Sequence, residues 1–413
     1  MDQKVIPAKT HKLPIEKIDP HAIYITEKLK EAGFIAYLVG GSVRDLLLGH
    51  VPKDFDISTS AKPEEIKKVF RNCLLIGRRF RLAHIRFGRK IFEVSTFRTG
   101  DLEKEELILR DNQWGYPEED AFRRDFTING LFYDPSNETI IDYVEGYADI
   151  KRRLLRTIGN PYTRFVQDPV RMLRLLKFQA RFDLEVDPEA HIAMVECKKE
   201  ILKSASARVL EEVLRMLESG ASQPFFELMT EHGLIEYLVP EIAQFIEKDP
   251  DGEEIYDYLD EVDAIFQDPS SSNLDRSVIL GSLSFPILEK RIKTQFLDRE
   301  HIPHLGQIQD QTHDLVNDLF QGFFRIPRRL KVGLINILIG QYRLTPLQKK
   351  KVQRRRIPKD ADFGLALSFL RLRCCLEPGL QKIHDWWMEA YERVEEKEKP
   401  SQRRRRRPRK RRR

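Results

Sequence analysis

The stretch 37–57, which reads YLVGGSVRDLLLGHVPKDFDI, constrains the fold more than any other part of the chain. The apolar run 34–39, which overlaps the start of this stretch, predicts a strand. Gly40 and Gly41 end that strand, because two glycines allow backbone angles that other side chains forbid. Ser42 is predicted to be the N-cap of the helix that follows, and the free N–H groups at a helix start attract anions. This order of elements therefore predicts a cradle for phosphate groups.

Two aspartates follow the cradle within a short distance along the chain. The segment 54–57 alternates polar and apolar residues, so in a strand Asp54 and Asp56 point to one face, roughly 7 Å apart. Two such carboxylates can share a pair of divalent cations, Mg²⁺ or Mn²⁺, about 4 Å apart. The alternative is a pair of solvated aspartates at a strand edge after an ordinary turn. The combination of cradle and carboxylates favours a metal site that acts on phosphates.

Composition limits the class of protein. The chain has 413 residues, of which 33% are charged and 41% hydrophobic, which is typical of a soluble protein with two or more domains. No apolar run is long enough to span a bilayer, and the N-terminus has no apolar signal core. The four cysteines are scattered and suit neither a disulfide framework nor a zinc site. We therefore expect a cytoplasmic protein with no membrane partner.

The positive charge is concentrated at the C-terminus. The formal net charge is +6, and residues 403–413 alone supply ten positive charges, so the rest of the chain is net negative. Such a run repels itself and cannot build a core, so residues 401–413 are expected to be a disordered tail. The tail is predicted to bind RNA phosphates through Arg403, Arg404, Arg405, Arg406 and Arg407. A solubility tail and a nuclear import signal are the alternatives.

Two further stretches carry candidate site residues. Glu93 lies in the predicted strand 91–98, and a third metal-binding carboxylate or a paired surface glutamate are equally open interpretations. The second stretch, 123–130, reads RRDFTING. Its arginines offer forked donors to phosphate, and its carboxylate and amide can accept hydrogen bonds from ribose hydroxyls. An Arg-Arg-Asp surface ion pair is the alternative.

From residue 150 onward helical periodicity replaces the strand signals, and a third motif begins a helix. Asp168 and Arg171 are three residues apart and therefore share a face of that helix. A helix N-cap with a local ion pair is the simplest interpretation. Arg208 and Glu212, four residues apart, are predicted to share a helix face in a mainly structural role.

The order of these motifs resembles the head of the polymerase-beta-like nucleotidyltransferases, specifically the class II branch of tRNA CCA-adding enzymes and bacterial poly(A) polymerases. Asp168 and Arg171 resemble the E-D-x-x-R motif of that class, whose Asp and Arg read the base of the incoming nucleotide. Gln167 stands where the class has Glu, so it can still hydrogen-bond but brings no charge to hold the arginine. The segments 75–85 and 109–115 and the basic tail look like the poly(A) polymerase version.

The resemblance implies a role for each residue of these motifs. It implies that Asp54, Asp56 and Asp125 are catalytic and that Asp54 and Asp56 bind the metal, with Glu93 as the candidate third metal ligand from its place in the strand. The ATP-binding residues that it implies are Gly40, Gly41, Ser42, Arg44, Arg123, Arg124, Asn129, Asp168, Arg171 and Arg174.

The implied fold is α+β, with a small mixed sheet and helices in a polymerase-beta-like head, followed by all-α domains and a disordered basic tail. The implied boundaries are a catalytic head at 20–155, a helical neck at 156–218, a helical body at 219–400 and the tail at 401–413. The neck is expected to bind the nucleotide base and RNA, and the body is expected to bind RNA.

The implied function is a template-independent poly(A) polymerase that adds AMP from ATP to RNA 3′ ends by a two-metal mechanism and releases pyrophosphate. A role in RNA processing and decay is expected, with RNA-decay or RNA chaperone proteins as partners. One alternative is a CCA-adding or A-adding tRNA nucleotidyltransferase. The other is an RNA-binding protein with an inactive head, although Asp54, Asp56 and Asp125 are all present.

Deletion of residues 401–413 is expected to weaken RNA binding and to flatten its dependence on salt, because about ten fewer phosphate contacts release fewer counterions. RNA affinity measured over a range of salt concentrations tests this. An unchanged affinity and slope would mean that the tail does not contact RNA.

Overall fold

The computed structural model describes residues 3–77, 82–99, 113–268, 270–271, 273–348 and 362–398. The chain divides into two compact units: an N-terminal unit of Met1–Glu212 with Glu231–Tyr237, and a C-terminal unit of Val213–Thr230 with Leu238–Arg413. The predicted segments 75–85 and 109–115 lie partly outside the described residues, and the predicted tail with Arg403–Arg407 lies wholly outside them. Among the described residues, none of the helices combines the length and apolar composition needed to cross a bilayer.

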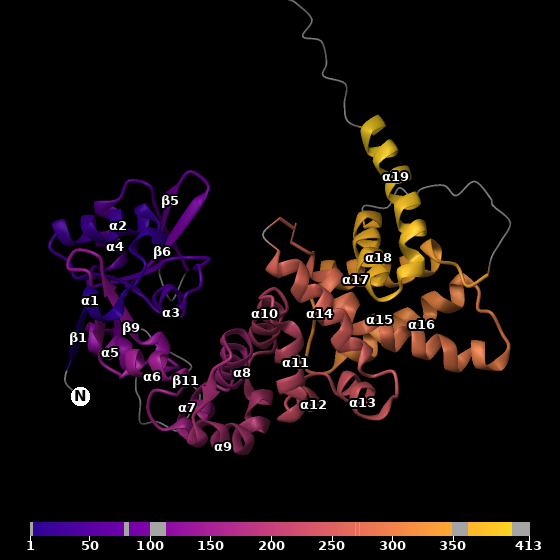
Figure 1. Cartoon of the computed structure of the whole chain (residues 1–413), viewed down its shortest axis with the longest axis horizontal. Helices are drawn as coiled ribbons and strands as arrows, with labels where there is room; N and C mark the ends of the chain where they lie inside the picture. The colour runs from indigo at the N-terminus through magenta and orange to yellow at the C-terminus, as the bar shows by residue number, and fades with distance from the viewer. Residues whose placement is uncertain are drawn as a thin grey trace, which may run out of the picture. The chain divides into compact units, whose positions relative to one another are not determined.

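An eight-stranded mixed sheet forms the centre of the N-terminal unit in its described part (Figure 1). Its strands, in spatial order, are β1 (Lys4–Pro7), β10 (Thr139–Asp142), β9 (Leu131–Asp134), β2 (Ala36–Val39), β3 (Asp56–Thr59), β6 (Lys90–Thr96), β5 (Leu82–Phe87) and β4 (Cys73–Ile76). Neighbouring strands are antiparallel except β3 and β6, which run parallel. The strand predicted from the run 34–39 is present as β2, and the predicted strand 91–98 is present as β6.

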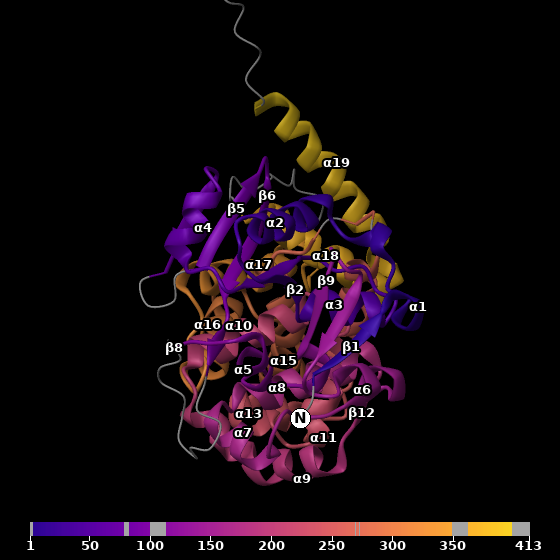
Figure 2. The ribbon, with the colours of Figure 1, turned by 90° about the vertical axis from the view of Figure 1, so that its left-hand side faces the viewer.

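Helices pack on both faces of this sheet. Helix α2 (Pro20–Glu31) contacts β2 and β3, and α4 (Pro63–Val69) contacts β4 and β5, so both cover one face (Figure 2). Asp19 caps α2 by accepting a hydrogen bond from the N–H of His21 at 2.9 Å, and a proline at N1 supports the start. On the other face, a buried cluster of Val39, Phe97 and Phe132 packs against helix α5 (Pro117–Phe122).

The glycine turn differs from its prediction in one respect. Helix α3 spans Gly41–Leu47, so Ser42 lies inside it and the N-cap is Gly40. The Ser42 hydroxyl donates to the carbonyl of Val39 instead of accepting from the helix. The prediction of a Ser42 cap was therefore wrong, because the chain turns one residue earlier, at a glycine with φ of 64° that only glycine adopts readily.

The remaining elements of the N-terminal unit are short or helical. They are α1 (Ala8–His11), β7 (Arg98–Thr99), β8 (Gln113–Trp114), α6 (Gly146–Arg152), β11 (Leu154–Leu155), α7 (Pro161–Gln167), α8 (Val170–Phe182), β12 (Glu185–Val186), α9 (Pro188–Cys197), α10 (Ser206–Leu217, which ends beyond this unit) and α12 (Ile235–Leu238, which also ends beyond it). Strands β11 and β12 pair in parallel, so two short strands lie after residue 150, where the sequence predicted only helices.

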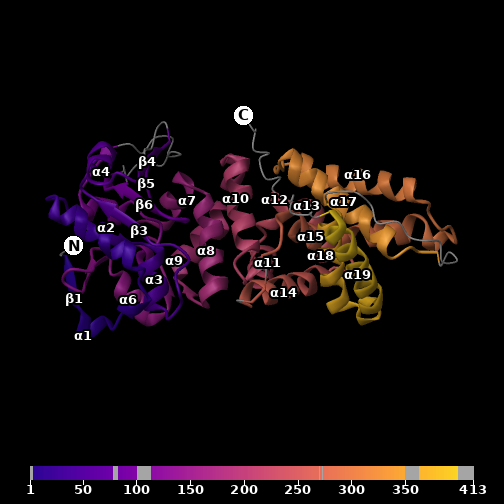
Figure 3. The same ribbon diagram turned by 90° about the horizontal axis from the view of Figure 1, so that it is seen from above.

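The C-terminal unit is helical in its described residues. Its helices are α11 (Ser222–Glu231), α13 (Pro240–Lys248), α14 (Glu254–Gln267), α15 (Arg276–Gln295), α16 (Leu305–Gln321), α17 (Arg328–Leu344), α18 (Phe363–Leu376) and α19 (Gln381–Glu398). The largely buried α15 packs against α16, α17 and α18, and α19 covers α18 (Figure 3). Trp387 is buried between them and donates to the carbonyl of Leu344 at 3.2 Å, whereas Trp386 is exposed.

Candidate active site

A row of side chains crosses the sheet on the face opposite α2 and α4. From β9 to β5 it consists of Phe132, Val39, Asp56, Glu93 and His84. The antiparallel ladders place Val39 opposite both Phe132 and Asp56, and His84 opposite Glu93. The parallel ladder of β3 and β6 begins one residue after Asp56 and Glu93, so these two carboxylates lie side by side. Register therefore brings together two predicted metal ligands that are far apart in the sequence.

The carboxylates of this row repel one another. Although Asp56 reaches solvent, the surrounding protein atoms desolvate it and raise its pKa to about 6, and the charges of Glu93 and Asp54 add to the rise. Arg124 opposes the rise. Asp54 precedes β3, so the strand that was predicted to carry both aspartates contains Asp56 alone. Glu93 also lies 3.4 Å from His84, so the metal-site and paired-glutamate interpretations both remain open.

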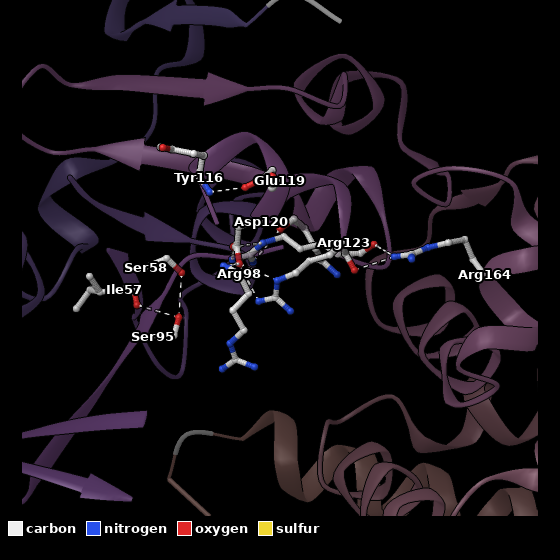
Figure 4. Close-up of polar contacts among 11 residues, drawn as sticks. Ile57, Ser58, Ser95, Arg98, Tyr116, Glu119, Asp120, Arg123 and Arg164 are labelled. Atoms are coloured by element: carbon white, nitrogen blue, oxygen red, sulfur yellow. Dashed lines mark hydrogen bonds and ion pairs between the residues drawn. The ribbon is translucent and has the colours of Figure 1, made fainter. Parts of the chain in front are cut away.

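No set of three or more His, Cys, Asp or Glu side chains within the described ranges has the arrangement of a metal cluster. The carboxylates of Asp54 and Glu93 are nevertheless near enough to raise the pKa of Asp56. Oxygen donors of this kind are the ligands that Mg²⁺ prefers. Two hydroxyls, those of Ser58 and Ser95, form a 3.0 Å hydrogen bond further along the same face (Figure 4).

The glycine turn lies under an arginine of the second motif. A Cβ atom built on Gly40 would be 2.8 Å from Nη1 of Arg124. The Arg124 guanidinium also lies over the ring of Phe132, 5.4 Å from its centroid. The predicted phosphate cradle and one predicted phosphate-binding arginine therefore meet beside the carboxylate row.

Asp120 holds both arginines of this motif. Its buried carboxylate accepts from Nε of Arg123 at 2.8 Å and from Nε and Nη2 of Arg124 at 3.2 and 2.8 Å. The N–H of Arg98 donates to the same carboxylate at 3.2 Å (Figure 4). Burial raises the pKa of Asp120, but the two arginines more than offset this, and the pKa is lowered overall. Asp120 was not singled out in the sequence, although its spacing of three and four residues from the arginines was a usable signal.

A buried polar chain connects the head to helix α8. Asp125 accepts from Nδ2 of Asn129 at 2.9 Å, and its other oxygen lies 2.9 Å from Nη2 of Arg174, an ion pair without hydrogen-bond geometry. Burial raises the pKa of Asp125, but Arg174 and Asn129 reverse the shift, and the pKa is lowered. Asn129 in turn accepts from Arg44, which is buried against Phe178 and also donates to its neighbour Asp45. Predicted nucleotide-binding residues thus contact each other.

The third motif has different partners from those predicted. Asp168 is bound by Arg208 through two hydrogen bonds of 2.8 and 2.7 Å. Arg208 and Glu212 both lie on α10, four residues apart as predicted, and Glu212 accepts from Lys177 at 3.0 Å. Nη1 of Arg171 donates to the carbonyl of Arg164 at 2.9 Å. Arg208 therefore belongs to the candidate site as well as to the helical scaffold.

Gln167 contacts a buried arginine that the sequence did not single out. Its Oε1 accepts from Nη1 of the buried Arg164 at 3.0 Å. Arg164 was not predicted to be a site residue, and its long-range contacts left no pattern in the sequence that could have identified it.

Three family models match the chain. The poly(A) polymerase head domain matches residues 36–156, a probable RNA- and SrmB-binding site of polymerase A matches 183–246, and the polymerase A arginine-rich C-terminus matches 307–413.

Curated proteins of two kinds resemble the chain. Poly(A) polymerase I of Salmonella typhimurium is 34% identical over 401 residues, which is 93% of this chain and 85% of the relative. The protein of the same name from Haemophilus influenzae is 36% identical and covers 94% of this chain and 88% of the relative. A CCA-adding enzyme of Streptococcus gordonii is 36% identical over 52% of this chain and 54% of the relative.

Solved structures share the fold. A tRNA nucleotidyltransferase complexed with a primer tRNA and an incoming ATP analog has a TM-score of 0.58 at 21% identity, covering 90% of this chain and 99% of that one. The CCA-adding enzyme of Bacillus stearothermophilus has a TM-score of 0.51 at 22% identity, covering 92% and 100%. The predicted α+β fold with a nucleotidyltransferase head is confirmed.

Replacing Gly40 with alanine is expected to destabilise the protein by about 1–3 kcal/mol, because of its positive φ and the close approach of Arg124. Gly33 is a matched control, since it also has positive φ but its Cβ would meet nothing within 4 Å. Urea unfolding should show a larger loss for Gly40→Ala than for Gly33→Ala. Equal losses would mean that Arg124 moves aside without cost.

Proposed function

The chain belongs to the poly(A) polymerase family of nucleotidyltransferases, and on that premise we propose that it adds AMP from ATP to RNA 3′ ends without a template and releases pyrophosphate. The observation that carries this proposal is the extent of similarity. Likeness to poly(A) polymerase I relatives runs along nearly the whole chain and includes the arginine-rich C-terminus, whereas likeness to CCA-adding enzymes covers about half of it. A CCA-adding activity is the runner-up.

In this proposal the ATP phosphates lie beside both the Gly40–Gly41 turn and Arg124, with Ser42 near the start of α3. Arg124 is already aimed at the turn by Asp120, so little side-chain freedom is lost when phosphate binds. Arg44 is buried among protein groups, and it contributes by fixing Asn129 and the turn. Arg123 supplies further positive charge.

The sugar and the base are assigned to the head–neck residues. Asp125, kept ionised by Arg174 and Asn129, is the residue that we assign to the ribose. Asp168 and Arg171 present a carboxylate and a guanidinium for the edge of adenine. A base with complementary donors and acceptors is favoured, because a mismatched base would leave buried polar groups unpaired.

Asp54, Asp56 and Glu93 would hold Mg²⁺ or Mn²⁺. The fit rests on their oxygen chemistry and on the raised pKa of Asp56. Burial raises that pKa most, the charges of Glu93 and Asp54 add to the rise, and a cation would relieve the repulsion between the carboxylates. A pair of bound ions would lower the pKa of the attacking RNA 3′-hydroxyl and offset the charge of the departing pyrophosphate.

The rest of the chain would hold RNA and recruit partners. We assign catalysis to the head (20–155), base and RNA binding to the neck (156–218), and RNA binding to the body (219–400) and the tail (401–413). A family model described as an RNA- and SrmB-binding site covers much of the neck, which supports RNA and a protein of RNA metabolism as partners. Tailed products would then enter RNA processing and decay.

Incubating the purified protein with Mg²⁺, an RNA and one nucleoside triphosphate at a time tests the proposal. The RNAs are a generic single strand and a tRNA that lacks its CCA end. We expect long ladders from ATP alone on the generic strand. A few additions that need CTP and the tRNA would make the chain a CCA-adding enzyme, and no incorporation would favour an inactive head.

Asp56→Asn is expected to abolish transfer and yet stabilise the metal-free protein at alkaline pH. The pKa of Asp56 is raised from 3.8 to about 6, so the folded state binds its proton more tightly than the unfolded state. Proton binding by Asp56 therefore stabilises the folded state fully below pH 4, and this stabilisation is lost as the pH rises through 6. At pH 8 the carboxylate is ionised, and its burial and repulsion destabilise the folded state. Removing the charge should therefore raise the melting temperature at pH 8 more than at pH 5.

Transfer by Asp56→Asn should fall about a thousandfold or more, since several kcal/mol of charge stabilisation are lost. Melting in EDTA and single-turnover transfer are the two measurements. Glu27→Gln, on the exposed surface of α2, is the control and should alter neither. A lower melting temperature for Asp56→Asn at pH 8 would contradict the repulsion described above.

A further inference from the structure

Arg164, on α7, is one of the largest fully buried side chains of the protein. Its Nη2 donates to the carbonyl of Arg123 (Figure 4) and to that of Arg124. Its Nη1 donates to Oε1 of Gln167. The arginine pair is thus held from two sides. Asp120 fixes the side chains, and Arg164 fixes the main chain.

The main chain of Arg164 contacts the motif that contains Asp168 and Arg171. Its carbonyl accepts from the N–H of Asp168 at 3.2 Å and from Nη1 of Arg171 at 2.9 Å. Asp168 is held in addition by Arg208. A single residue therefore contacts the two arginines assigned to phosphate and the two residues assigned to the base.

A buried guanidinium is a costly way to connect two segments. Burial, together with the charge of Arg171, lowers the pKa of Arg164 to about 9, and the buried Nε has no hydrogen-bond partner. An apolar side chain of similar size could fill the same space at less cost, because buried ionic groups seldom add net stability. The retained cation therefore points to a task other than packing.

We propose that Arg164 is a positioning residue that fixes the spacing between the phosphate-binding arginines and the base-reading pair. The inference rests on the proposed function. With that spacing fixed, a nucleotide whose phosphates are bound has its base in one position relative to Asp168 and Arg171. Discrimination between a purine and a pyrimidine then depends on Arg164, although it touches neither the base nor the phosphates in this assignment.

Arg164→Lys tests the proposal, because lysine keeps the charge but cannot donate in a fork to two carbonyls and Gln167 at once. Binding of ATP and of CTP is measured at equilibrium with Mg²⁺, together with the KM for RNA and the melting temperature. We expect ATP binding to weaken about tenfold, as for loss of one preorganised polar contact, with little change in CTP binding or in the KM for RNA.

Arg181→Lys is the matched control. Arg181 lies on α8 and pairs with Asp45 at 3.1 Å, so it also joins the head to the helices but contacts neither of the two motifs. It should leave the ratio of ATP to CTP affinity unchanged. An equal loss in both variants, or an unchanged ratio in Arg164→Lys, would overturn the proposal in favour of a purely structural role.

Gln167 gives a second test that disturbs the core less. Gln167→Met removes the acceptor for Arg164 and should reduce the preference for ATP about threefold, whereas Gln167→Glu keeps an acceptor and should retain it. Equal ratios in these two variants would overturn the proposal even if Arg164→Lys fails to fold. The RNA extension assay with the wild-type protein tests the proposed function separately. A wild-type protein that elongates RNA with CTP would contradict the proposed function, whereas the variants test only the role of Arg164.

Discussion

The ion pair between Asp125 and Arg174 is the constraint on which the N-terminal unit depends. Asp125 is almost completely buried, and an ionised carboxylate without water must be compensated by a nearby cation. Removing one member of such a pair typically costs about 3–5 kcal/mol. The strand-rich region and α8 are therefore bound to fold together, and the chain of contacts through Asn129 to Arg44 extends that requirement to the glycine turn.

Local signals in the sequence predicted the elements that surround the site. The strand at 34–39, the strand at 91–98 and the glycine break after β2 each depend on neighbouring residues, so they could be predicted without knowing the fold. Glu93 could be placed on a strand face, but its position beside Asp56 follows from the parallel pairing of β3 with β6. Register between strands that are distant in the chain leaves no local pattern.

Tertiary partners could not be predicted from spacing. Arg208 and Glu212 have the spacing of a helical ion pair, which is worth only about 0.3–0.5 kcal/mol. The bidentate contact of Arg208 with Asp168 is stronger than such a pair, and Arg208 therefore pairs with Asp168. Ser42 shows the same limit at a turn, where the backbone freedom of Gly40 decided the helix start. Arg164 contacts residues about forty positions away along the chain, beyond the reach of any periodicity.

The contacts of Arg164 and Arg174 have a consequence for how such chains could recombine in evolution. A crossover near residue 155 would separate Asp125 from Arg174 and the carbonyls of the arginine pair from Arg164. In such a hybrid, each buried charged residue and its partner would come from two different parental proteins. An exchange after residue 212, where the main segment of the N-terminal unit ends, keeps every one of these partners together. Heritable modules in this lineage should therefore be longer than the catalytic head.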